Sequence, residues 1–325
     1  MSYTKKLFYF LISIFCYISC DNSSKLENKI QAFPLNLKID RFDKKFMNIT
    51  KEKFPDFKSK YQFLFSNNFT DSMYLDRIED SIQKEIQSSI DSVFADFKST
   101  EKDLISLYKH IKYYNPSLKI PTLITVNSDI DYLNKIIPMG DSIVLINIDN
   151  YLGAEHKFYL SFPKWIRKNL EKDQIVMDLA DIYASRWINQ PRRLTFLDQM
   201  IYEGKKLYLK DLWIPKSDDF TKIGYKSDEI EWVKNNEIKI WEYFNEQELF
   251  FSTDRRLLNR FINPGPFSKF YRNIDQDSPA SIGKYFGWQI VKSYIKNNDV
   301  SLLELLQKDS ETIFKKSKFK PKISY

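Results

Sequence analysis

The two cysteines are the most reactive side chains of this chain, and both lie near its amino terminus. Cys16 and Cys20 fall within the stretch FCYISCDNSS at residues 15–24, and no other thiol occurs among the 325 residues. A thiol can attack an electrophile, bind a metal or form a disulfide, and it can also be acylated. The sequence that precedes Cys20, an apolar run of about 13 residues at 7–19, decides between these chemistries.

That apolar run is typical of a cleaved export signal. A helix that spans a bilayer needs about 20 apolar residues, so the run at 7–19 is too short for a permanent span. Two lysines precede it and a small residue ends it, which is the layout of a secretory signal. The alternative is a buried amino-terminal helix of a cytosolic protein, but nothing amphipathic interrupts the run. We predict a signal peptide at residues 1–19.

The end of the signal indicates lipidation of Cys20. Tyr17-Ile18-Ser19-Cys20 resembles the lipobox of bacterial lipoproteins, although tyrosine stands where leucine is usual. In that class the signal is cut after Ser19, the Cys20 thiol carries a diacylglycerol through a thioether, and the new amine receives an N-acyl chain such as palmitate. A single acyl chain binds a membrane only marginally, at about 10⁴ M⁻¹, whereas two or three chains hold firmly. We expect this lipid and no other cofactor.

The rest of the chain has the composition of a folded body. Hydrophobic residues make up 43% and aromatic residues 16%, and a chain of about 300 residues buries about three quarters of its unfolded surface. Removal of the two signal lysines changes the net charge from +7 to +5 (48 minus 43), and an exported chain is not expected to bind nucleic acid. The basic stretch at 315–322 is interpreted as a solvated tail, with contact to anionic lipid as the alternative.

Hydrophobic periodicity predicts a mainly helical α+β fold with a small sheet. A flexible tether is expected at 20–33, followed by a single globular domain at 34–325. Strands are expected at 35–42, 120–127 and 142–149, the last two as a hairpin or as adjacent strands after a turn at 138–141. Helices are expected at 73–98, 101–114, 173–188, 194–210, 227–249, 281–297 and 301–315.

A long loop at 263–283 separates two of these helices. It is rich in proline and aromatic residues, and loops of this length are usually functional or packed by their own side chains. Phe267, Phe270 and Tyr271 are therefore either plugs in the core, which we favour, or contact residues for a partner.

Seven segments, in order over nearly the whole mature chain, share their pattern with one known family. They are RFD (41–43), GDSIVLINIDNYLG (140–153), QMIYEGKKLYLKDLWIP (199–215), STD (252–254), NPGPFSKFY (263–271), SPASIGKYFGWQIVKSYIKNN (278–298) and IFKKSKFKP (313–321). Together they resemble the gliding-motility lipoprotein GldB family of Bacteroidetes, which also carries a lipobox.

The resemblance implies a lipid-anchored protein of the cell envelope that faces the periplasm. Members of this family are needed for gliding and are linked to the machinery that secretes surface adhesins, so other envelope proteins of that apparatus are the expected partners. The lipobox does not distinguish the inner from the outer membrane.

The same family is similar to predicted zinc peptidases with an HExxH helix and a later glutamate in an EG motif. That chemistry needs two histidines four residues apart on one helical face and a glutamate as general base. Here the frame falls on MDLAD at 177–181, with Met177 and Asp181 in the histidine positions, Asp178 in that of the general base, and Glu203 in the EG motif. Zinc prefers imidazole and thiolate donors, so the resemblance implies a degenerate zincin-like architecture without catalytic zinc.

The degenerate frame leaves three interpretations. Asp178, Asp181 and Glu203 could bind a hard cation, they could form a solvated or internally paired face, which we favour, or they could line a remnant cleft reused for binding. The two histidines, His110 and His156, lie elsewhere and are interpreted as structural.

No catalytic residue or metal ligand is therefore assigned from the sequence. It favours a non-enzymatic envelope protein that acts through protein contacts. The alternatives are a metal-dependent hydrolase with unusual ligands, and a periplasmic carrier or chaperone that uses the remnant cleft.

Overall fold

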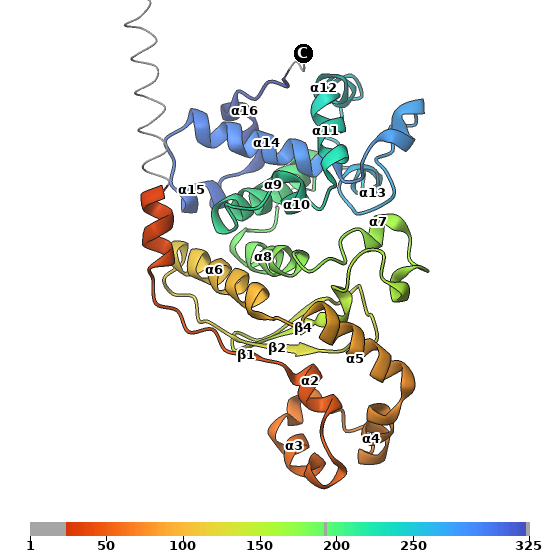
Figure 1. The fold of residues 1–325 in the computed structure, drawn as a ribbon. Helices are drawn as coiled ribbons and strands as arrows, with labels where there is room; N and C mark the ends of the chain where they lie inside the picture. The colour runs from red at the N-terminus through yellow and green to blue at the C-terminus, as the bar shows by residue number, and fades with distance from the viewer. Residues whose placement is uncertain (1–23, 192–193, 323–325) are drawn as a thin grey trace, which may run out of the picture.

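The computed structural model describes residues 24–191 and 194–322, which are coloured along the chain in Figure 1. The predicted signal peptide, Ser19 and Cys20 lie outside the described residues. A four-stranded sheet lies beneath stacked layers of helices, and a small helical lobe covers part of the sheet's opposite face. The prediction of a mainly helical α+β fold is confirmed.

The sheet is mixed, with strand order β1-β2-β4-β3. The strands are β1 (Ile39–Asp40), β2 (Thr122–Val126), β3 (Ile136–Met139) and β4 (Ile143–Asn147). β1, β2 and β4 run parallel, and β3 pairs antiparallel with β4 at one edge.

The two central strands lie where the sequence predicts them, as parallel neighbours. The expected strand at 35–42 is wrong for most of its length, because only two of its residues pair with β2. The expected turn at 138–141 is also partly wrong, since Pro138 and Met139 belong to β3 and the hairpin to β4 turns at Gly140, whose φ is +62°. A proline is tolerated there because β3 is an edge strand.

The helices fall into an amino-terminal and a carboxy-terminal group. The first comprises α2 (Phe42–Met47), α3 (Phe54–Lys60), α4 (Asp71–Glu79), α5 (Ser81–Val93) and α6 (Lys98–Tyr114). The second comprises α7 (Lys164–Arg167), α8 (Gln174–Trp187), α9 (Phe196–Trp213), α10 (Asp219–Ile223), α11 (Ser227–Asn235), α12 (Glu237–Glu246), α13 (Arg256–Phe261), α14 (Ile282–Asn297), α15 (Leu302–Gln307) and α16 (Ser310–Ser317).

Three apolar clusters hold these layers together. The first lies between the upper face of the sheet and α5, α6 and α8. The second fills the helical layer around α9 and α14. The third is an aromatic lobe of α2, α3 and α4 against the lower face of the sheet. The alternation of side chains along β2 and β4 supplies apolar residues to both faces of the sheet.

Three predicted long helices are each divided in two. The divided ranges are 73–98, 227–249 and 301–315. The breaks occur at Asp80, at Asn236 and just before Asp309. Asp80 and Asp309 each accept a backbone N–H of the following helix, at 2.9 and 2.8 Å. A side chain that caps a new helix competes with continuation of the old one.

The prediction of a flexible tether at 20–33 is wrong for residues 24–31, because they form a helix docked on α6. Ile30 is buried with 2% exposure. The Glu27 carboxylate lies 2.9 Å from Nε2 of His110, and Nδ1 of the same ring lies 2.8 Å from the Ser106 carbonyl oxygen. These partners are about 80 residues away in sequence, so local composition does not reveal the docking.

Helices α9 and α14 come into direct backbone contact at two glycines. A Cβ atom added to Gly287 would lie 1.7 Å from the carbonyl oxygen of Met200, and one added to Gly204 would lie 2.3 Å from the backbone of Gly287. No real side chain fits at such distances. Gly204 is the glycine of the EG motif, and glycine is required at this position because a larger residue would collide with α14.

We predict that Gly287→Ala destabilises the protein by about 3 kcal/mol or more, because the added methyl group meets rigid backbone rather than a movable side chain. Urea unfolding followed by circular dichroism measures this. The matched control is Gly265→Ala, whose added Cβ would have its nearest neighbour at 4.0 Å and which should change stability by less than about 0.5 kcal/mol. Equal stability of the two variants would contradict the steric argument.

Candidate functional site

The degenerate zinc frame lies on α8, where part of that helix lines a polar cleft. The cleft has a volume of about 230 Å³. Its charged lining consists of Asp178 and Asp181 together with Lys135, Lys168, Lys210, Lys222 and Lys284. Met177 does not line it, because its side chain is buried in the protein with 2% exposure.

Asp178 is held by two partners from outside α8. Its carboxylate accepts a hydrogen bond of 2.8 Å from the Tyr151 hydroxyl and forms an ion pair with Lys135. Tyr151 is fully buried, and burial together with the Asp178 charge raises the pKa of its phenol far above the ordinary value. Tyr151 therefore remains a hydrogen-bond donor to this carboxylate.

Asp181 and Glu203 are held by lysines of the helical layer. The Lys210 ammonium lies 2.8 Å from Asp181, and Lys206 bridges Asp181 at 3.8 Å and Glu203 at 3.3 Å. Lys284 of α14 lies 3.5 Å from Glu203. Burial opposes ionisation of Asp181, but the charges of Lys210 and Lys206 outweigh it and lower the pKa of that carboxyl.

This arrangement does not suit a metal ion. Each of the three carboxylates already faces at least one ammonium group, and the described residues contain no cluster of three or more histidine, cysteine or acidic side chains that could hold a metal. A cation placed among them would meet the repulsion of the lysines, since unit charges a few ångströms apart interact by several kcal/mol near a protein surface.

The charged network continues away from the cleft. Lys210 also donates to the Lys222 carbonyl at 2.9 Å, and the Lys222 ammonium lies 2.9 Å from Asp211. Asp211 in turn accepts a hydrogen bond of 2.8 Å from the Trp288 indole and pairs with Lys292 at 3.3 Å. The chain of polar contacts thus joins α8, α9, α10 and α14.

The three aromatic residues of the 263–283 loop that were predicted to be core plugs or contact residues have different environments. Phe270 is buried with 4% exposure against Phe261 and Tyr243, with ring centroids 5.1 Å apart in each case. Phe267 is half-buried. Tyr271 is 75% exposed and has the Arg260 guanidinium 4.7 Å from its ring centroid. Phe270 is therefore a core residue, and Tyr271 presents its ring to solvent.

A comparison with known families now identifies the chain's relatives. Residues 23–321 match the family described as gliding motility protein GldB. The chain belongs to this family. Searches of curated proteins and of solved structures give no significant match. Within the part of the chain that the structure describes, no helix is long and apolar enough to cross a membrane.

Two of the segments that carry the GldB resemblance meet in the helical layer. The EG motif supplies Glu203 and Gly204, and the GWQ segment supplies Gly287 and Trp288. The two glycines form the backbone contact of α9 with α14, while Glu203 and Trp288 join the charged network. In this GldB-family chain the motif residues thus hold helices together.

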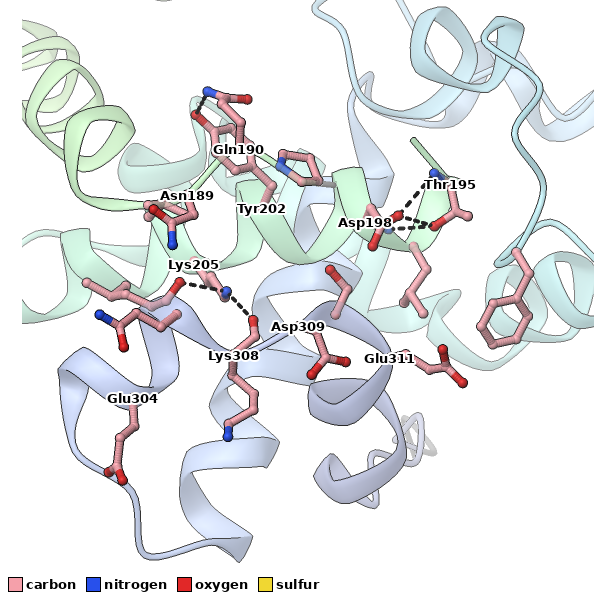
Figure 2. Close-up of a pocket in the computed structure, with 17 residues that line it drawn as sticks. Asn189, Gln190, Thr195, Asp198, Tyr202, Lys205, Glu304, Lys308, Asp309 and Glu311 are labelled. Carbon is pink, nitrogen blue, oxygen red and sulfur yellow. Dashed lines mark hydrogen bonds between the residues drawn. The ribbon is translucent and has the colours of Figure 1, made fainter. Parts of the chain in front are cut away.

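A second pocket of about 650 Å³ lies between the start of α9 and the α15–α16 region (Figure 2). Lys205 reaches from α9 and donates hydrogen bonds of 3.0 Å to the Leu306 carbonyl and 2.7 Å to the Lys308 carbonyl. The residue is 5% exposed, and burial lowers the pKa of its ammonium to about 8. Because both bonds go to carbonyls at the end of α15, Lys205 acts as a cap for that helix.

Sequence reasoning assigned the carboxylates and missed the buried lysines of α9. Lys210, which pairs with Asp181, and Lys205, which bonds to the end of α15, are 4% and 5% exposed. The available signal was the presence of lysine among the apolar positions of a predicted helix, since lysine is almost never buried without a partner.

We predict that Asp181→Asn destabilises the protein by about 1–3 kcal/mol at pH 7, because it leaves the buried Lys210 ammonium without its counter-charge. The side chain of Asp181 is 37% exposed, which keeps the loss below that of a fully buried pair. The folded-state pKa of Asp181 is lowered, so its contribution is complete above the unfolded pKa of about 3.9 and is lost as the pH falls through the folded value.

Urea unfolding at pH 7 and pH 3 measures both effects. The difference between wild type and Asp181→Asn should shrink at pH 3. Glu231→Gln, an exposed change on α11, is the control and should match wild type at both values. A variant as stable as wild type at pH 7 would show that Lys210 does not need this carboxylate.

We predict that Lys205→Met removes a rise of stability with pH. The lysine has a pKa of about 8 in the folded chain and about 10.4 when unfolded, so between these values the unfolded chain binds more protons and wild-type stability rises by up to about 1.4 kcal/mol per pH unit. The unfolding free energy of wild type minus that of the variant should therefore increase from pH 7 to pH 10. A difference that is constant over this range would contradict the lowered pKa.

Proposed function

We propose that this GldB-family protein is an envelope lipoprotein held on a membrane by acyl chains at Cys20, facing the periplasm. There it supports gliding and the associated secretion by binding partner proteins. Its membership of a family of gliding motility proteins supports the role in gliding. The lipobox at 17–20 supports the anchor.

The amino-terminal helix follows Cys20 closely in the sequence. Ser24 lies four residues after Cys20, so their Cα atoms are at most about 14 Å apart even in a fully extended chain. That helix is docked on α6 at the left edge of the molecule in Figure 1, whereas the lobe of α2–α4 lies at the bottom, on the other side of the sheet. The lipid would hold the edge next to α6 near the membrane and leave the lobe exposed to the periplasm.

One observation favours a binding role over catalysis: Asp178, Asp181 and Glu203 are each paired with lysine. A metallopeptidase needs ligands free to hold a metal and an open position for water. In the GldB-family chain these side chains instead join α8 and α9 to neighbouring segments of the fold, which supports a stable body that works through its surfaces.

We predict that Cys20→Ala abolishes gliding and moves the protein from the membrane to the soluble fraction, since no acyl chain can then be attached. Membrane fractionation, gliding on agar and export of surface adhesins are measured in cells that carry the variant as their only copy. Cys16→Ala, which changes the other cysteine of the predicted signal, is the matched control and should behave as wild type. A Cys20→Ala protein that stays in the membrane and supports gliding would overturn the anchor.

A further inference from the structure

A cavity larger than the lysine-paired cleft lies under the sheet. We name it the sub-sheet groove. It has a volume of about 950 Å³ and is bounded by α2, α4, the start of α5 and the lower face of the sheet. This volume is at the upper end of the range for ligand pockets, about 300–1,000 Å³, so the groove has room for several side chains of a partner.

The walls of the groove are apolar, and part of them faces solvent. Phe42, Phe46 and Phe65 form the deep wall and are each 8% exposed. Nearer the mouth, Phe69 is 48% and Ile82 58% exposed. Met73 at 49% and Ile137 at 36% add to the same opening. Apolar side chains gathered in one concave surface mark an interaction site more often than the same residues scattered singly.

The rim of the groove is acidic. Asp76, Asp80 and Asp131 line it, and within residues 24–191 and 194–322 no lysine or arginine forms an ion pair with any of them. The single cation of the lining, Arg77, is neutralised by Asp129 through hydrogen bonds of 2.7 and 2.9 Å. A local negative field on a chain whose net charge is +5 after removal of the signal lysines favours a basic partner at this place.

We propose that the sub-sheet groove binds an amphipathic helical segment of a partner protein, with apolar residues on one face and lysine or arginine beside them. This inference rests on the proposed function, because it names the kind of partner that the anchored protein contacts. The apolar face of such a helix fills the groove at i, i+3, i+4 and i+7, and its basic residues meet the acidic rim.

The geometry favours a helix over an added strand. β3 is the edge strand next to the groove, but Pro138 lies within it and lacks the N–H that strand addition would use. The charge favours a peptide over anionic lipid, since phosphate groups would be repelled by Asp76, Asp80 and Asp131. The groove also lies beside the α2–α4 lobe, on the face of the sheet opposite α6 and the helix docked on it.

The test measures binding of a designed peptide to the full-length lipidated protein. The protein is held in nanodiscs of zwitterionic lipid, with empty nanodiscs as the blank, and binding is followed by surface plasmon resonance. The probe is a helical peptide of about 18 residues, which is five turns, with leucines on one face and lysines on the other. A second peptide carries glutamates in place of the lysines.

We predict that the leucine–lysine peptide binds at least about tenfold more tightly than the leucine–glutamate peptide, and less tightly as salt is raised. Asp76→Lys with Asp131→Asn should weaken binding about tenfold or more, and Phe69→Ser with Ile82→Ser should do the same. The matched controls are Glu231→Lys with Glu242→Gln, and Leu160→Ser with Leu303→Ser, which change exposed residues that do not line the groove. Both controls should bind as wild type.

Three results would overturn the proposal. One is equal binding of the two peptides, and another is wild-type affinity in both groove variants with their folding confirmed by circular dichroism. The third is attachment of phosphatidylglycerol vesicles that is lost in the Phe69→Ser, Ile82→Ser variant, which would assign the groove to lipid. The readout does not depend on gliding, so failure of the groove and failure of the Cys20 anchor are distinguishable.

Discussion

The backbone contact of α9 with α14 at Gly204 and Gly287 is the constraint on which the helical half depends. Because the two helices approach without side chains between them, the residues beside the glycines are aimed in fixed directions. Lys205 points to the end of α15. Lys206 points to Asp181 of α8, and Glu203 points to Lys284 of α14. The close contact thus determines where the charges of α9 lie.

Those charges also account for the role of the acidic side chains on α8. A buried ammonium is costly unless it is paired and hydrogen-bonded, and Lys210 meets that need with Asp181 and a backbone carbonyl. Asp181 of α8 therefore neutralises lysines of α9, while Asp178 pairs with Lys135. An unpaired carboxylate would be needed for a metal, and the same lysines prevent one.

Local patterns predicted what depends on local interactions. The periodicity of α8, α9 and α14 and the β-branched runs of β2 and β4 gave these elements within about three residues of their observed ends. The docking of residues 24–31 depends on His110, and the pairing of Asp178 depends on Lys135, so neither could be predicted without the tertiary fold. The sub-sheet groove is formed by segments at 42–83 and 126–147, which are distant in the sequence. The aspartates of its rim are separated in the sequence by lysines and apolar residues, so they do not form a recognisable acidic segment.

The distribution of charge agrees with the proposed orientation of the molecule. The exposed lysines of 315–322 follow α16 in the upper helical layer, whereas the acidic rim borders the lobe beneath the sheet. An anionic membrane surface attracts the first and repels the second. A protein tethered next to the helix at 24–31 would therefore keep the groove turned from the lipid, where a basic amphipathic segment in the periplasm can reach it.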